Sequence, residues 1–320
     1  MLDPKQLVVL GAGNVGLTTA RGGYHVNIVA EILPSDPKNI KYTSQWAGAH
    51  HVSLAGSDVR QQKMDQEMFK TMWELSAPGG PAEGCFLRMH EDEYFPGPIA
   101  NPEVLQVMPD FKVIPSSSLP PDCAEGISFS AVTTDCPVYL NYLLSRFLAT
   151  GGSIVRGTVQ HIAQVVEGGA GIFNGRKCLA SPSAIVACIG LGARTLGGVE
   201  DEDVYPTRGQ TALLRAPWVK SGRAISSKSG SWTYIIPRRS GDMIIGGSKG
   251  ENDFIIEEGC GLRPARKGGI RLEVEWADSQ DQKKVPVIFN YGHGAYGYIN
   301  SWGSSTIALE LLEKVLAESN

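Results

Sequence analysis

A glycine-rich turn near the N-terminus is the feature that most constrains the fold of this chain. The apolar run at residues 6–10 leads into Gly11-Ala12-Gly13-Asn14-Val15-Gly16, and residues 17–20 have the composition of a helix start. A strand, a glycine turn and a helix in this order are typical of a dinucleotide-binding βαβ unit. A second β-rich run, residues 24–30, ends at Glu31. An acidic residue at this point accepts hydrogen bonds from the ribose hydroxyls of a dinucleotide, so the sequence predicts a Rossmann-like domain.

The three glycines of the turn have separate physical roles. Gly11 allows the tight turn, Gly13 lets the backbone approach a pyrophosphate, and Gly16 allows close packing of helix and strand. The pyrophosphate then lies against N–H groups at a helix N-terminus. This motif alone does not separate FAD from NAD, because both bind the same fold.

The rest of the chain alternates between helical and β-rich patterns. Apolar residues at Met64, Met68, Met72 and Leu75 recur at helical spacing, which predicts a core-facing helix over residues 58–76. Residues 78–126 are rich in Pro and Gly, and we expect them to be irregular and to face the substrate. Further segments are expected as a helix over 137–148, strands over 153–156 and 184–189, and an antiparallel sheet from 211–214, 233–236 and 243–245.

Composition excludes several classes of partner. The chain has 29 Lys and Arg against 33 Asp and Glu, scattered along it, so we expect neither nucleic acid nor a membrane surface as a partner. No stretch is long and apolar enough to span a bilayer. The six cysteines form no CxxC pair, and His50-His51 has no second ligand set at a useful spacing, so we expect no metal site.

The C-terminal segment from Val287 to Gly303, with its core Gly292-His293-Gly294-Ala295-Tyr296-Gly297, closely resembles the signature segment of D-amino acid oxidases. Five further blocks follow the same family pattern in the family's order. They are Trp46-Ala47-Gly48-Ala49, Gly190-Leu191-Gly192-Ala193, Arg208-Gly209-Gln210, Tyr234-Ile235-Ile236-Pro237-Arg238 and Gly261-Leu262-Arg263-Pro264-Ala265-Arg266.

The resemblance implies an α/β (α+β) fold in which a Rossmann-like FAD-binding domain is interleaved with an antiparallel-sheet substrate domain. Residues 1–60, 135–208 and 261–320 are expected in the FAD-binding domain, and residues 61–134 and 209–260 in the substrate domain. The implied activity is oxidation of neutral D-amino acids to imino acids, which hydrolyse to 2-oxo acids and ammonia, while O₂ becomes H₂O₂. The family also implies non-covalent FAD, a possible homodimer and a peroxisomal location. No targeting signal is visible at the C-terminus, and the location otherwise expected is cytoplasmic.

The resemblance also assigns site residues. Arg263 is expected to pair with the substrate carboxylate through its planar fork, Tyr234 to be its hydroxyl partner, and the carbonyl of Ala295 to accept from the substrate amine. His293 is expected to be structural, because this chemistry needs no general base near Cα. The expected cofactor-binding residues are Gly11, Gly13, Val15, Gly16, Glu31, Thr43, Ser44, Gly48, Ala49, Val159, Gly190, Gly192, Arg263, Gly294, Ala295, Tyr296, Gly297, Tyr298 and Ile299.

The chain departs from the family in two places and leaves two alternatives open. It is short near residues 20–23, where about a helical turn is missing, and near 251–260, where the family carries a longer, largely helical segment. A D-aspartate oxidase is one alternative; it requires a second cation for the side-chain carboxylate, for which Arg238 and Arg215 are candidates. The other is a catalytically silent flavin-binding protein.

Overall fold

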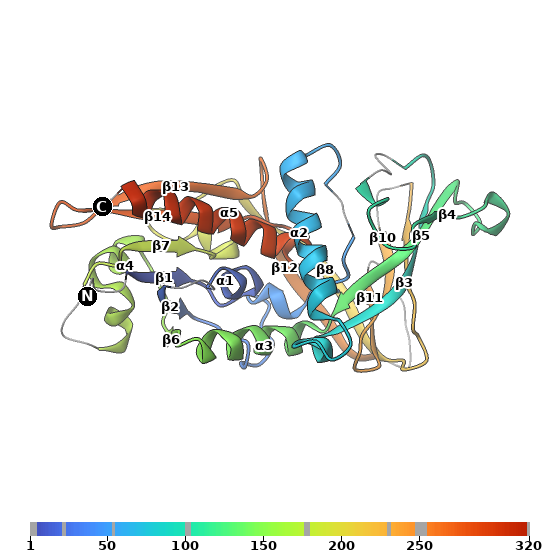
Figure 1. The fold of residues 1–320 in the computed structure, drawn as a ribbon, viewed down its shortest axis with the longest axis horizontal. Helices are drawn as coiled ribbons and strands as arrows, with labels where there is room; N and C mark the ends of the chain where they lie inside the picture. The colour runs from blue at the N-terminus through green and yellow to red at the C-terminus, as the bar shows by residue number, and fades with distance from the viewer. Residues whose placement is uncertain are drawn as a thin grey trace.

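The chain folds into two β-sheets that lie at opposite ends of the molecule (Figure 1). The computed structural model describes residues 5–20, 24–52, 55–99, 104–175, 180–228, 232–246 and 255–318, without the side chains of 255–258. Within these ranges one sheet has six strands in the order β13-β14-β7-β1-β2-β6, and the other has eight in the order β12-β8-β11-β10-β9-β3-β5-β4. The expected mixed α/β fold class is confirmed.

The six-stranded sheet includes β1, which precedes the glycine turn, and is the Rossmann-like sheet that the turn predicts, here named the dinucleotide-type sheet. Its strands are β1 (Gln6–Leu10), β2 (His25–Ala30), β6 (Ser153–Arg156), β7 (Ala184–Ala187), β13 (Arg271–Asp278) and β14 (Lys284–Tyr291). All neighbours pair in parallel except β13 with β14. β7 is buried at every residue, as expected of a continuous apolar run in a parallel sheet.

Helices cover this sheet and join it to the rest of the molecule. They are α1 (Asn14–Thr19), α2 (Val59–Leu75), α3 (Cys136–Ala149), α4 (Ile162–Gly168) and α5 (Gly297–Glu318). Short 3₁₀ turns are η1 (Thr43–Gln45), η2 (Glu83–Cys85), η4 (Ser116–Ser118), η5 (Gly169–Asn174) and η6 (Gly190–Arg194). The methionines predicted to be core residues of α2, at positions 64, 68 and 72, are buried in the same apolar cluster as the inner face of α5.

The eight-stranded sheet is mainly antiparallel. Its strands are β3 (Phe86–Phe95), β4 (Lys112–Val113), β5 (Glu125–Thr134), β8 (Val204–Arg215), β9 (Gly222–Ser226), β10 (Trp232–Pro237), β11 (Asp242–Gly246) and β12 (Ile255–Arg266). The pair β3 and β9 is parallel, and the other neighbours are antiparallel. The three later β-rich runs expected in this sheet lie in β8, β10 and β11.

Two expectations from the sequence are corrected. Residues 78–126 are not wholly irregular, because β3 and β4 lie within them and β5 begins at Glu125. The sequence did not predict β3, because Glu91 and Glu93 are buried in it and the strand therefore does not alternate between apolar and polar residues. Helix α1 begins at Asn14 rather than after Gly16 and has six residues. Residues 21–23 of the first short segment and 251–254 of the second lie outside the described residues.

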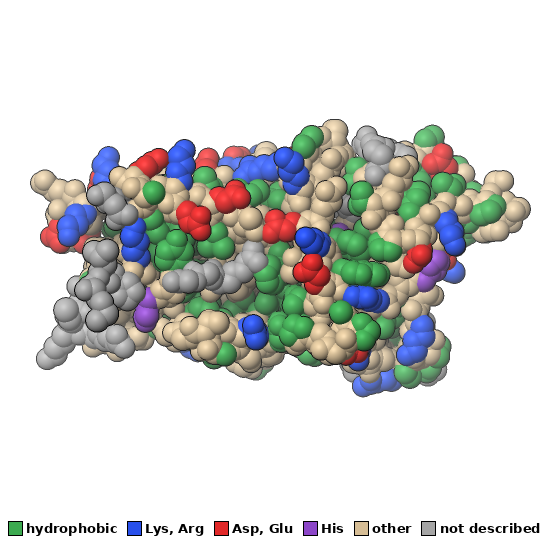
Figure 2. Space-filling model, in the orientation of Figure 1, with side chains coloured by type: hydrophobic (Ala, Val, Ile, Leu, Met, Phe, Trp, Pro, Cys, Tyr) green, Lys and Arg blue, Asp and Glu red, His purple; other side chains and the backbone are tan. Residues whose placement is uncertain are grey.

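The division into two domains remains a proposal. β8 begins at Val204 and β12 ends at Arg266, so both strands of the eight-stranded sheet extend a few residues beyond the expected crossings at 208/209 and 260/261. Among the described helices, none combines the length and apolarity that crossing a bilayer requires. On the face shown in Figure 2, acidic and basic side chains are intermixed without a broad patch of either sign.

Candidate active site

A cavity of about 920 Å³ lies where the two sheets meet. Its wall includes the glycine turn after β1, the 190–192 turn after β7, segments of β8, β10 and β12, and the loop before α5. The first two turns follow the carboxyl ends of parallel strands, which is where α/β sheets bind their ligands. The cavity is therefore bounded by the dinucleotide-type sheet on one side and the antiparallel sheet on the other.

The glycine turn is closely packed at two of its three glycines. Gly11 has φ of +98°, and a Cβ there would lie 2.5 Å from the carbonyl oxygen of Cys188. A Cβ on Gly16 would lie 2.0 Å from the carbonyl oxygen of Gly11. Gly13 faces the cavity, and the neighbouring N–H of Asn14 donates to Ser44 Oγ over 3.0 Å. Gly11 thus lies in the tight turn, Gly13 faces the space expected for the pyrophosphate, and Gly16 lies at the close helix–strand contact.

Hydrogen bonds hold the segment after β2 beside the turn. The Tyr42 hydroxyl donates to the carbonyl of Ala12 over 2.5 Å, and Thr43 Oγ1 donates to the carbonyl of Leu262 over 2.6 Å. Tyr298, at the start of α5, donates to the carbonyl of Ser44 over 2.8 Å. The segment at 42–44 is therefore tied to the glycine turn, to β12 and to α5, three elements far apart in the sequence.

Gly48 and Ala49 continue the cavity wall in a constrained conformation. A Cβ on Gly48 would lie 2.6 Å from Ile236 Cδ1, so a larger residue would displace β10 side chains. Ala49 has φ of +57°, a conformation that is uncommon for a residue with a Cβ. Its carbonyl accepts from the N–H of Thr134 over 2.8 Å. Strained backbone of this kind concentrates at ligand sites.

Tyr234 and Arg263 lie together at the cavity, although 29 residues separate them. Both side chains line it, and burial raises the pKa of Tyr234 while the nearby Arg263 charge opposes that rise. Two glycines make room for them. A Cβ on Gly246 would lie 2.2 Å from the Tyr234 hydroxyl, and one on Gly209 would lie 2.8 Å from Arg263 Cζ. The sequence analysis missed both glycines as site residues, since only the strand pairing reveals them.

The loop before α5 reaches the same place. Its Gly294 N–H donates to the Pro264 carbonyl over 2.8 Å, next to Arg263, and Ala295 lines the cavity and is exposed to it. His293 is buried, is 3.1 Å from Ser304 Oγ, and has its pKa lowered by burial to about 3. A neutral, buried histidine fits the expected structural role.

Most of the expected site residues line this cavity, but three do not. Gly16 is in the helix–strand contact, the Tyr296 side chain packs beside an apolar cluster that includes Ile127 and Phe129, and Val159 packs beside a cluster that includes Val8 and Val29. The contact of Val159 with a cofactor remains a proposal that its side chain does not support. Arg238 and Arg215, named for a second substrate carboxylate, also lie outside the lining: Arg238 faces Asp135 at 3.7 Å, and Arg215 pairs with Asp242 at 2.9 Å.

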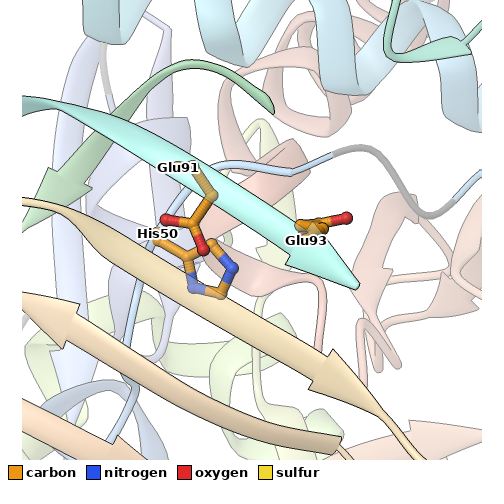
Figure 3. A group of neighbouring side chains, drawn as sticks. All are labelled: His50, Glu91 and Glu93. Carbon is orange, nitrogen blue, oxygen red and sulfur yellow. The ribbon is translucent and has the colours of Figure 1, made fainter. Parts of the chain in front are cut away.

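A group of three ionisable side chains behind the cavity was not foreseen. Glu91 and Glu93 are buried on β3, and His50, which lines the cavity, lies beside them (Figure 3). Burial raises the pKa of Glu93 to about 7 and lowers that of His50 to about 4, and burial together with the neighbouring carboxylates raises the pKa of Glu91 well above its usual range. No sequence spacing joins these residues, because a loop, α2 and η2 separate position 50 from β3.

The residues present fit FAD. Gly11, Gly13 and Val15 line the cavity at the start of α1, where a helix N-terminus can receive a pyrophosphate. Glu31 lines the same cavity just after β2, where a ribose is expected. The buried Asn14 Oδ1 has no hydrogen-bond partner among the described residues. The cavity then extends past Gly190 to Tyr234 and Arg263, far beyond a nucleotide alone.

Comparisons with known proteins agree with this geometry. Residues 90–311 match the sequence model of the DAO family, described as FAD dependent oxidoreductase. The chain is 32% identical to a D-aspartate oxidase of Cryptococcus neoformans var. grubii, over 97% of each chain, and 32% identical to a D-amino-acid oxidase of Schizosaccharomyces pombe, over 94% of each.

Solved structures show the same fold at low identity. A glycine oxidase from Geobacillus kaustophilus has a TM-score of 0.67 at 13% identity, with 97% of this chain and 95% of that one covered. An L-alpha-glycerophosphate oxidase from Mycoplasma pneumoniae with FAD bound also has a TM-score of 0.67, at 12% identity over 98% and 95% of the two chains. The cavity geometry and these matches together show that the chain belongs to the DAO family of FAD-dependent oxidoreductases and is an FAD-dependent oxidase.

Proposed function

We propose that this protein oxidises neutral D-amino acids at the cavity between the two sheets. The observation that carries the proposal is that Tyr234 and Arg263 line the same cavity as Ala295, whose loop is hydrogen-bonded to Pro264 beside Arg263. A guanidinium beside a hydroxyl is a binding site for a carboxylate, and a backbone carbonyl in the same cavity can accept from an amine.

These three contacts define how a substrate is held. Arg263 forms two parallel charge-assisted hydrogen bonds to the carboxylate, Tyr234 donates a third, and the Ala295 carbonyl accepts from the amine. The carbonyl accepts from the amine in either protonation state, but oxidation requires the neutral amine, because its lone pair forms the C=N bond as the hydride leaves Cα. With carboxylate and amine fixed, one enantiomer turns its Cα–H toward the flavin, and the other presents its side chain or a wrong bond.

The reaction is a two-electron oxidation. When bound, FAD would supply the acceptor for the Cα hydride and the route by which two electrons reach O₂. The substrate loses that hydride and one N–H proton to become an imino acid, and O₂ gains two electrons and two protons to become H₂O₂. Water then converts the imino acid to a 2-oxo acid and ammonia.

The comparisons also support D-aspartate as a second candidate substrate, because one 32% identical relative bears that name. The two arginines named for it, Arg238 and Arg215, are engaged outside the cavity. Of the described lining residues, Arg208 is the arginine other than Arg263, and it is exposed. We favour neutral substrates because the wall beside Tyr234 includes Trp232, Ile236 and Val52.

The test is peroxide formation by the FAD-loaded protein with D-alanine, D-aspartate and their L enantiomers. The proposal expects kcat/KM to be highest for D-alanine and negligible for both L forms. Faster turnover of D-aspartate would support the second candidate, and bound flavin without turnover of any amino acid would indicate a silent flavin-binding protein. A homodimer and a peroxisomal location are further proposals that rest on the family resemblance alone.

A further inference from the structure

Strand β3 places two carboxylates on the sheet face that carries Tyr234. Glu93 pairs with Ala224 of β9, and Ala224 pairs in turn with Tyr234, so these side chains share a face. One register position along, Phe95 makes an edge-to-face contact with Trp232, with ring centroids 6.0 Å apart, which identifies the same face. Ala224 is thus the residue between Glu93 and Tyr234 across the three strands.

Both carboxylates are buried without protein partners among the described residues. Glu91 is 0% exposed and Glu93 is 1% exposed. Both carboxylate oxygens of Glu91 and Oε1 of Glu93 lack a hydrogen-bond partner. A Cβ on Gly222 would lie 1.9 Å from Glu91 Oε2, so the neighbouring strand has a glycine where this carboxylate lies. Burying carboxylates without compensation is costly, and a bound cation supplies compensation.

His50 adds a nitrogen ligand to the two carboxylates. Each of the three residues offers one ligand atom, and these atoms lie within 4.8 Å of one another. Figure 3 shows the Glu91 carboxylate beside the imidazole of His50, with Glu93 farther along the same strand. Zinc bonds of about 2.0–2.2 Å place ligand atoms roughly 3.3–3.6 Å apart in a tetrahedral site. The present separations, at most 4.8 Å, therefore exceed those of a closed site by roughly 1.5 Å at most.

We propose that His50, Glu91 and Glu93 bind a divalent transition-metal ion of the Zn²⁺ type directly behind the substrate cavity. One imidazole and two carboxylates are a ligand set that Zn²⁺ accepts, and two carboxylates balance its charge. Three protein ligands leave a fourth position for water. This inference reverses the expectation of no metal site drawn from the sequence, because that expectation considered His50 with His51 and not with β3.

The ion would act on the substrate site through His50. The His50 and Tyr234 ring centroids are 6.1 Å apart, and both rings line the cavity. A metal bond at one imidazole nitrogen fixes the ring's orientation, so this part of the wall becomes rigid when the ion binds. Zn²⁺ is thus expected to alter KM for amino acids more than it alters the flavin spectrum.

The test is calorimetric titration of chelator-treated, FAD-loaded protein with Zn²⁺, using Mg²⁺ as a probe of hard-cation binding. The proposal expects one equivalent of Zn²⁺ to bind and Mg²⁺ not to compete. The double variant Glu91→Gln and Glu93→Gln should lose this binding. A matched control is His90→Ala: His90 is exposed on the same strand, 3.1 Å from Asp92, and its loss should leave the binding unchanged.

Folding of the variants is checked by their flavin spectra, and X-ray absorption of Zn-loaded wild-type protein provides a test that needs no variant. A coordination shell containing one imidazole and carboxylate oxygens supports the site. The proposal is overturned if wild-type protein binds no Zn²⁺, which would mean that the three groups share protons instead. It is equally overturned if Zn²⁺ binding survives in the double variant, disappears in the His90 variant, or shows a shell without imidazole.

Discussion

Replacement of Arg263 by alanine is the perturbation that most sharply separates substrate binding from cofactor binding. The guanidinium lies over Gly209 and lines the cavity together with Tyr234, while the glycine turn expected to bind the pyrophosphate follows β1 of the other sheet. Removal of the fork leaves a substrate carboxylate unpaired in a site that FAD covers. Loss of one partner of such a pair costs roughly 2–5 kcal/mol, which corresponds to a fall in kcat/KM of about 30- to 4,000-fold.

The assay is anaerobic stopped-flow reduction of the flavin by D-alanine, with the visible spectrum of the resting protein recorded first. Arg263→Ala should retain its flavin and lose reduction at low substrate concentration. Arg263→Lys should fall between wild type and Arg263→Ala, because an ammonium keeps the charge but lacks the fork. The control is Arg215→Ala, which removes an exposed arginine of the same sheet. Unchanged kcat/KM in Arg263→Ala would show that the carboxylate binds elsewhere.

Three further substitutions test other parts of the account. Gly16→Ala should yield protein without bound flavin, because the new Cβ would lie 2.0 Å from a backbone oxygen of the glycine turn, whereas Gly84→Ala, with nothing within 4 Å, should bind FAD normally. Gly246→Ala should raise KM for D-alanine without loss of flavin, since its Cβ would displace the hydroxyl of the substrate-site tyrosine. Arg238→Met should lower the free energy of unfolding by roughly 3–5 kcal/mol, because Asp135 would remain buried without its ion partner; chemical denaturation measures this, and unchanged stability would contradict it.

The sequence was sufficient to predict the elements that depend on local pattern. The strand and glycine turn at residues 6–16, the methionine stripe of α2 and the buried strand β7 each follow from a short periodicity or from backbone demands of glycine. The pairing of Tyr234 with Arg263 was anticipated through family resemblance, because no local rule connects β10 with β12.

Features that arise from strand register were beyond a reading of the sequence. From the sequence alone, Gly209 and Gly246 are ordinary strand glycines. The structure shows that the side chains of Arg263 and Tyr234 lie where a Cβ at these two positions would be. β3 was included in a Pro- and Gly-rich segment expected to be irregular, and its buried Glu91 and Glu93 interrupt the alternation of apolar and polar residues by which strands are recognised. In both cases the feature could not be predicted because it depends on contacts between side chains of strands that are far apart in the sequence.

The most direct test of the central claim is flavin reduction under nitrogen by D-alanine, L-alanine and Cα-deuterated D-alanine. The account predicts full bleaching of the oxidised flavin by D-alanine, a primary isotope effect on that rate with the deuterated substrate, and no reduction by L-alanine on the same timescale. Reduction by L-alanine at a rate comparable to that of D-alanine would contradict the three-point geometry of Arg263, Tyr234 and Ala295.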